Sequence, residues 1–86
     1  MQLRKLMAGW YRLSNEFCFS NIRLGRKESG ELTTKWYADV RDSRTGNLKR
    51  YAGIWNTRRD AIEEAEDLLR QYAAILKMDL RGEITP

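Results

Sequence analysis

The order of apolar and polar residues along the chain predicts a helix at each end. Apolar residues near the N-terminus recur at the three- and four-residue spacing of one helical face, which predicts a helix over residues 2–14. Residues 57–80 carry a longer stripe of the same kind, with Thr57 and Asp60 placed to cap its start. The two stripes are Leu3, Leu6, Met7, Trp10 and Leu13, and then Ala61, Ile62, Ala65, Leu68, Leu69, Tyr72 and Leu76.

Between the two helices, three stretches alternate in polarity and predict antiparallel strands. These strands cover residues 17–24, 33–41 and 48–55. Ser29-Gly30 and Gly46 supply the two turns. The second strand then has an apolar face, Trp36, Ala38 and Val40, and a polar face, Lys35, Tyr37, Asp39 and Arg41.

Together these elements predict one α+β domain over residues 1–86, because a chain of this length has room for a single core. An N-terminal helix (residues 1–16) precedes a three-stranded antiparallel sheet (17–56). A long C-terminal helix (57–80) packs on one sheet face, and a short tail (81–86) follows.

The placement of the aromatic residues follows from these elements. Trp10 and Trp36 are in phase with apolar neighbours, so we expect both in the core. Trp55 and Tyr51 are exposed if they share a face with Lys49, whereas a bulge near Gly53 would turn Trp55 inward.

Composition removes most of the usual tools of catalysis. The chain has no histidine and a single cysteine, which excludes an intrachain disulfide and a cysteine-based zinc site. Cys18 is expected to be a small buried hydrophobe, and the acidic run at residues 63–67 a solvated helix face. We therefore expect no enzyme activity, catalytic residue, cofactor or metal. The chain has no membrane-length apolar run and no signal-peptide pattern, so we expect a cytoplasmic protein without a membrane partner.

Charge is segregated along the chain, and this suggests a function. Residues 18–56 contain eight basic and four acidic residues, whereas residues 57–80 contain four basic and six acidic ones. The predicted sheet is thus basic and interleaved with aromatic residues, a pattern typical of sheets that bind nucleic acid. The candidate contacts are Lys35, Tyr37, Arg41, Arg44, Lys49 and Tyr51, with Arg23, Arg26, Lys27, Arg58 and Arg59 as further phosphate contacts.

Part of the sequence resembles a known family. Residues 36–46, WYADVRDSRTG, followed by Lys49-Arg50-Tyr51 and by NTRRDA at 56–61, resemble the N-terminal arm-type DNA-binding domain of phage tyrosine integrases and the related AP2-like integrase domains. The resemblance covers residues 20–75. It implies a three-stranded sheet, backed by a helix, that enters the major groove of duplex DNA. Since it reaches no catalytic domain, it implies a free-standing accessory or regulatory factor of phage or mobile-element type rather than a recombinase.

Two alternatives remain open. The order helix, three strands, helix is also that of double-stranded-RNA-binding domains, in which a basic pair such as Arg58-Arg59 grips phosphates, although such domains also use a histidine that this chain lacks. Alternatively, the basic sheet meets an acidic protein surface, as in a phage-type inhibitor or adaptor. In that case the N-terminal helix would be available as a homodimer interface.

Overall fold

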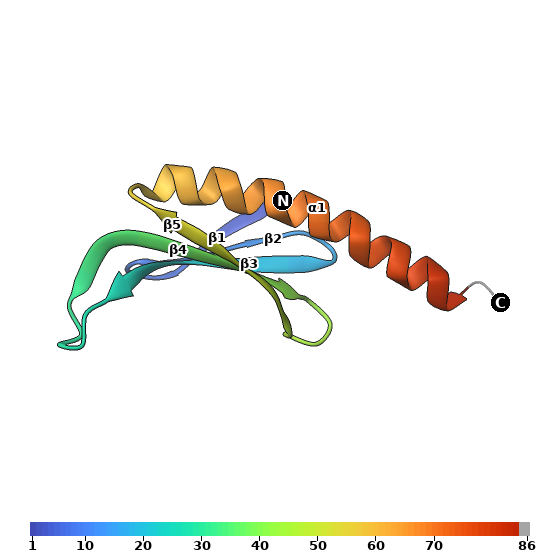
Figure 1. Ribbon diagram of the computed structural model, residues 1–86, viewed down its shortest axis with the longest axis horizontal. Helices are drawn as coiled ribbons and strands as arrows, with labels where there is room; N and C mark the ends of the chain where they lie inside the picture. Colours follow the sequence, from blue (N-terminus) through green and yellow to red (C-terminus); the bar gives the residue numbers. More distant parts are fainter. Residues whose placement is uncertain (85–86) are drawn as a thin grey trace.

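The protein is an antiparallel sheet with one long helix on one of its faces (Figure 1). The computed structural model describes residues 1–84 and, among these, the side chains of residues 1–51 and 53–77. Five strands follow one another across the sheet in the order β1-β2-β3-β4-β5. They are β1 (Gln2–Met7), β2 (Trp10–Ser14), β3 (Cys18–Arg26), β4 (Leu32–Asp42) and β5 (Leu48–Trp55), and the helix is α1 (Arg58–Ile84).

The N-terminal helix predicted from the sequence is wrong, and so is the three-stranded sheet. The residues assigned to that helix form the β1–β2 hairpin, in which Leu3 pairs with Leu13 and Arg4 with Arg12. Gly9 makes the turn with a φ of 73°, a conformation that is easy for glycine, and its carbonyl accepts the Leu24 N–H at 2.8 Å. The apolar spacing that suggested a helix was coincidental, because Leu3 and Met7 are exposed.

This correction removes the structural argument for two of the sequence-based alternatives, duplex RNA binding and a homodimer, neither of which it tests. The order of elements is five strands and then one helix, so the similarity to a double-stranded-RNA-binding domain no longer holds. The N-terminal helix that was expected to offer a dimer interface is absent from the described residues, so that interface has no structural basis.

A register shift in β5 decides the position of Trp55. Ala38 pairs with Ala52 and Tyr37 pairs with Ile54, which leaves Gly53 as an extra residue between the two pairs. This bulge brings Trp55 opposite Trp36, where both rings are partly buried against the core. Trp55 therefore faces inward, as the sequence predicts for a bulge at Gly53.

Helix α1 begins where the capping signal places it and continues past its predicted end. The Asp60 N–H donates to Thr57 Oγ1 at 3.2 Å, which makes Thr57 the cap. The helix extends to Ile84, so residues 81–84, expected in the tail, are helical, and the last two residues of the expected tail lie outside the described residues. Its C-terminal part runs beyond the edge of the sheet (Figure 1).

The core lies between α1 and the sheet. Ala61 and Ala65 are fully buried and are small enough to let the helix lie close to the strands. Leu69 packs one turn further on, and its carbonyl accepts the side-chain amide of Asn15 at 3.2 Å. Cys18 is buried beside it, as expected, and this burial raises the pKa of its thiol, so Cys18 stays neutral in the core. Over residues 1–84, no part of the helix is both long and apolar enough to cross a membrane.

Asp42 closes the β4–β5 hairpin as a buried, ionised carboxylate. It is 3% exposed, and its Oδ1 accepts the backbone N–H of Arg44 at 2.8 Å. Its Oδ2 lies 3.3 Å from the Arg44 guanidinium. The hydrogen bonds from the side chain and backbone of Arg44 hold the pKa of Asp42 below its ordinary value of 3.8.

Replacing Asp42 by asparagine is expected to lower the melting temperature at neutral pH, because the charge-assisted contacts to Arg44 are lost. Since folding lowers the pKa of Asp42, its charge contributes stability above the unfolded pKa of about 4 and loses that contribution as the pH falls below it. Thermal melts of both proteins from neutral to acidic pH should therefore converge in acid. A difference that stays constant with pH would show that the charge is not the cause.

Candidate nucleic-acid interface

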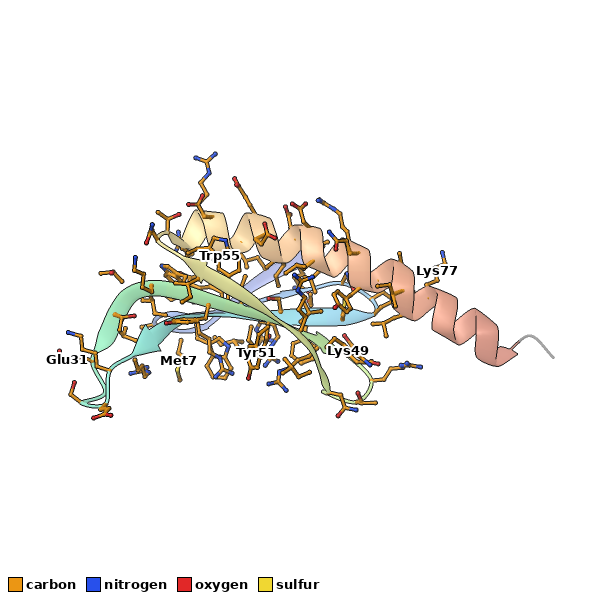
Figure 2. All side chains as sticks on the ribbon, in the orientation of Figure 1. Met7, Glu31, Lys49, Tyr51, Trp55 and Lys77 are labelled. Atoms are coloured by element: carbon orange, nitrogen blue, oxygen red, sulfur yellow. The ribbon has the colours of Figure 1, made fainter. Side chains whose placement is uncertain are left out.

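The sheet face that points away from α1 carries aligned rows of arginine and aromatic side chains. The side chains of Ile22 and Val40 point toward α1 and are fully buried. Because successive residues of a strand face opposite sides, their neighbours in sequence lie on the other face of the sheet. Figure 2 shows Tyr51 on this side, across the sheet from the helix. We call this surface the open face, and its residues include Arg4, Met7, Trp10, Arg12, Phe19, Asn21, Arg23, Tyr37, Asp39, Arg41, Tyr51 and Ile54.

Two open-face arginines are stacked on aromatic rings. The Arg23 guanidinium carbon lies 4.1 Å from the centroid of the Trp10 ring, and that of Arg12 lies 4.7 Å from the centroid of Phe19. Asn21 Oδ1 accepts Arg12 Nε–H at 3.0 Å and Trp10 Nε1–H at 3.2 Å. These contacts fix the planes of the guanidinium groups before any ligand arrives, which lowers the entropy cost of binding an anion.

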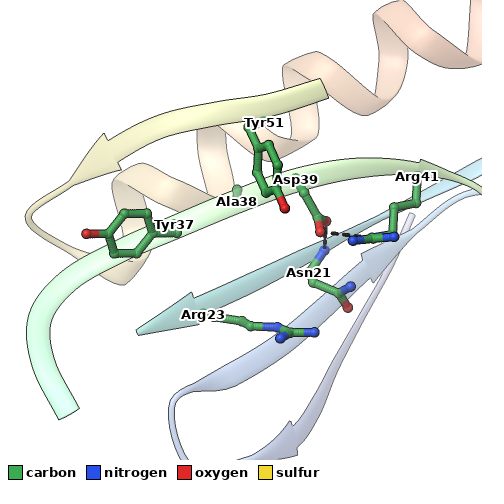
Figure 3. Close-up of a pocket in the computed structure, with 7 residues that line it drawn as sticks. All are labelled: Asn21, Arg23, Tyr37, Ala38, Asp39, Arg41 and Tyr51. Carbon is green, nitrogen blue, oxygen red and sulfur yellow. Dashed lines mark hydrogen bonds and ion pairs between the residues drawn. The ribbon is translucent and has the colours of Figure 1, made fainter. Parts of the chain in front are cut away.

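A shallow hollow of about 260 Å³ lies in the centre of the open face (Figure 3). This volume is below the roughly 300–1,000 Å³ of ordinary small-molecule pockets. The hollow is therefore better suited to contact with part of a larger molecule than to enclosing a ligand. Its lining is Asn21, Arg23, Tyr37, Ala38, Asp39, Arg41 and Tyr51.

Asp39 organises one side of this hollow. Its carboxylate accepts the backbone N–H of Asn21 at 2.8 Å and Arg41 Nε–H at 3.0 Å, as drawn in Figure 3. Arg41 also donates from Nη1 to the Gly46 carbonyl at 3.0 Å. Two of the three nitrogens of Arg41 are thus engaged within the protein.

The two tyrosines that border the hollow present their rings to solvent. Tyr51 is 71% exposed and Tyr37 is 42% exposed. Tyr37 lies close over β3 because residue 25 is glycine, where a Cβ would come within 2.6 Å of Tyr37 Cε2. Exposed aromatic rings beside cations stack on the bases of single strands, whereas in a duplex such rings can reach only base edges and sugars.

The charges of the open face are largely uncompensated. Among the residues that the structure describes, Arg4, Arg12 and Arg23 form no ion pair, and the acid on this face, Asp39, is paired with Arg41. Acidic residues of α1 lie on the opposite side of the molecule, and three of them pair with helix arginines: Glu63 with Arg59, and Glu66 and Asp67 with Arg70. The protein therefore has a basic face and an acidic back.

Four of the residues predicted from the sequence come together around the hollow: Arg23, Tyr37, Arg41 and Tyr51.

The other predicted contacts lie at the rim or elsewhere. Lys49 and Arg44 lie at the β4–β5 hairpin, and Lys35 Nζ bonds Asn56 Oδ1 near the start of α1. Arg26 donates to the Gly30 carbonyl in the β3–β4 hairpin, where Lys27 pairs with Glu31 at 3.9 Å.

Arg58 and Arg59 belong to the opposite layer and not to the open face. Arg58 Nη1 donates to the Tyr11 hydroxyl at 2.7 Å on the helix side of β2, and Arg59 pairs with Glu63 at 3.2 Å. The sequence suggested that this pair extends the basic surface at the edge of the sheet. In the structure, Arg58 and Arg59 lie in the helix layer and do not extend it.

The sequence missed the part of the open face that β1 and β2 supply. Trp10, expected in the core, lies on the open face because residues 2–14 form strands, and Arg4 and Arg12 join it there. A signal was present: Gly9 disfavours a helix and precedes Trp10-Tyr11, a pair with high strand propensity. No local signal identifies Asn21, whose role depends on contacts with other strands.

Comparison with protein families, curated proteins and solved structures gave no match. In the part of the chain that the structure describes, no group of three or more acidic, cysteine or histidine side chains could hold a metal ion. The case for a function therefore rests on the open face itself.

Proposed function

We propose that this protein binds duplex DNA through the open face of its sheet. The observation that carries the proposal is Arg23, which has no acidic partner among the described residues, lies directly opposite exposed Tyr37 and shares the central hollow with exposed Tyr51. Arg4 and Arg12, also without an acidic partner in the described structure, lie further along the same face. Cations arranged in this way neutralise phosphates, and they gain affinity from the release of counterions. The acidic residues of α1, on the opposite side of the molecule, repel a polyanion there, so the charge distribution orients the open face toward it.

The resemblance of residues 20–75 to integrase arm-type domains suggests the same function, although the sheet has five strands and not the three that the resemblance implies. On this basis the protein acts as an accessory or regulatory DNA-binding factor in the cytoplasm, of phage or mobile-element type.

Arg23 is better placed than Arg41 to read a base edge. Bidentate recognition of guanine needs two parallel N–H groups of one guanidinium. Arg41 has Nε and Nη1 engaged by Asp39 and Gly46, whereas Arg23 stacks on Trp10 without a hydrogen bond to the described part of the chain. We therefore assign base contact first to Arg23, and a positioning contact to Arg41.

The test compares ligands of one sequence as duplex DNA, duplex RNA and single strands, by fluorescence anisotropy at several salt concentrations. We expect duplex DNA to bind tightest, with the logarithm of the affinity falling linearly with the logarithm of salt. Tighter binding of duplex RNA, or no binding of any nucleic acid at low salt, would contradict the proposal. The second of these results would favour an acidic protein as partner.

Substitutions on the acidic helix give the matched contrast. Glu63→Ala is expected to leave duplex affinity unchanged or slightly raised, because Glu63 is exposed on the back of the molecule and repels phosphate at long range. The same anisotropy titration measures it. A Glu63→Ala protein that no longer binds would place the binding surface on α1 instead.

A further inference from the structure

The width of the sheet limits how much of it can enter a DNA groove. Neighbouring strands lie about 4.8 Å apart, so five strands span roughly 19 Å. The major groove is only about 12 Å wide. If β3, β4 and β5 occupy the groove, as the proposed function requires, the β1–β2 hairpin lies outside it, above the phosphate backbone.

The hairpin has the chemistry for that position. Arg4 and Arg12 are directly opposite each other in the β1–β2 pairing. Like charges in such a pair destabilise a sheet, and within the described residues no acidic side chain pairs with either arginine. A bound anion between the two guanidinium groups would relieve this repulsion.

One of the two arginines is already oriented. Arg12 is fixed by the hydrogen bond from its Nε to Asn21 and by stacking on Phe19. Its two terminal nitrogens make no hydrogen bond within the described structure. Arg4 on the edge strand is exposed and can close on a ligand from the outside. This combination suits a phosphate group, which accepts hydrogen bonds from several directions.

We propose that the β1–β2 hairpin is a phosphate clamp, in which Arg4 and Arg12 hold the DNA backbone at the edge of the groove that β3–β5 occupy. The inference rests on the proposed function and adds a second role to the same face. β3–β5 contact the bases, and the hairpin contributes affinity that does not depend on sequence.

The experiment uses Arg4→Ala and Arg12→Ala in the full chain, with a G·C-rich and an A·T-rich duplex of equal length. Each variant should reduce the slope of log affinity against log salt by about one, and should weaken binding to both duplexes by the same factor. Lys5→Ala is the matched control. Lys5 neighbours Arg4 and carries the same charge, but it pairs with Tyr11 and lies on the helix side of β1. Its slope should stay that of the parent.

The possible results separate the two proposals. If the parent binds duplex DNA and the slopes of the arginine variants equal that of Lys5→Ala, the clamp is wrong and the proposed function stands. If the parent binds no duplex, both are wrong. Arg12→Lys controls for misfolding, because it keeps the positive charge. Its salt slope should match that of the parent. A slope lowered as much as in Arg12→Ala would overturn the clamp.

Discussion

Replacing Leu69 by alanine is expected to cost about 2–5 kcal/mol of unfolding free energy. Leu69 is 0% exposed and packs at the centre of the helix–sheet core, so the substitution leaves a cavity that the surrounding strands cannot easily fill. For a domain of this size, a loss of this kind lowers the melting temperature by about 8–40 °C. Thermal unfolding followed by circular dichroism measures it.

Ile75 provides the control on the same helix. It is 48% exposed, so Ile75→Ala should change the unfolding free energy by less than about 0.5 kcal/mol. If the two variants melted together, Leu69 would not be the centre of the core and the packing of α1 on the sheet would be wrong.

Removing the Arg23 side chain is expected to have the largest effect on DNA binding. Arg23 combines a hydrogen-bonding fork that the described structure leaves free with a place in the central hollow, and its plane is already set by Trp10. Arg23→Ala should weaken binding to a preferred duplex by about 1–3 kcal/mol, which is roughly 5- to 150-fold. Anisotropy titration against duplexes selected from a random pool gives the value.

Arg23→Lys separates charge from geometry. Lysine keeps the charge but lacks the fork, so discrimination between sequences should fall while non-specific affinity is retained. Lys77→Ala removes an exposed charge from α1, on the other side of the sheet (Figure 2), and should leave both quantities unchanged. Equal losses on every sequence with Arg23→Ala would reduce Arg23 to a phosphate contact.

Local sequence signals predict most of the second half of the chain, although they end α1 at residue 80 and leave the face of Trp55 open. Alternation around Trp36 and Val40 identifies the buried side of β4, and Thr57 marks the start of α1, because both signals depend on residues close together in the sequence. The same alternation places Tyr37 and Arg41 together on the other face of β4, whereas the face of Tyr51 was left open by the sequence.

The first fourteen residues show where such signals fail. Leu3, Met7 and Trp10 fit a helical period. The segment nevertheless forms strands, because Trp10 pairs with Arg23 across β2 and β3. No local sequence pattern predicts that pairing. The position of Asn21 is hidden for the same reason, since its contacts come from β2 and β4. The periodicity of apolar and polar residues therefore could not predict about half of the residues of the candidate site.

The meander has a consequence for how the chain folds. Every strand pairs with its neighbour in sequence, so each hairpin closes a short loop and the sheet can grow one hairpin at a time. The distant contacts come from α1, as in the hydrogen bond from Asn15 to Leu69, 54 residues away. We expect docking of the helix to be the slow step, and core substitutions in α1 to report on it in the folding rate.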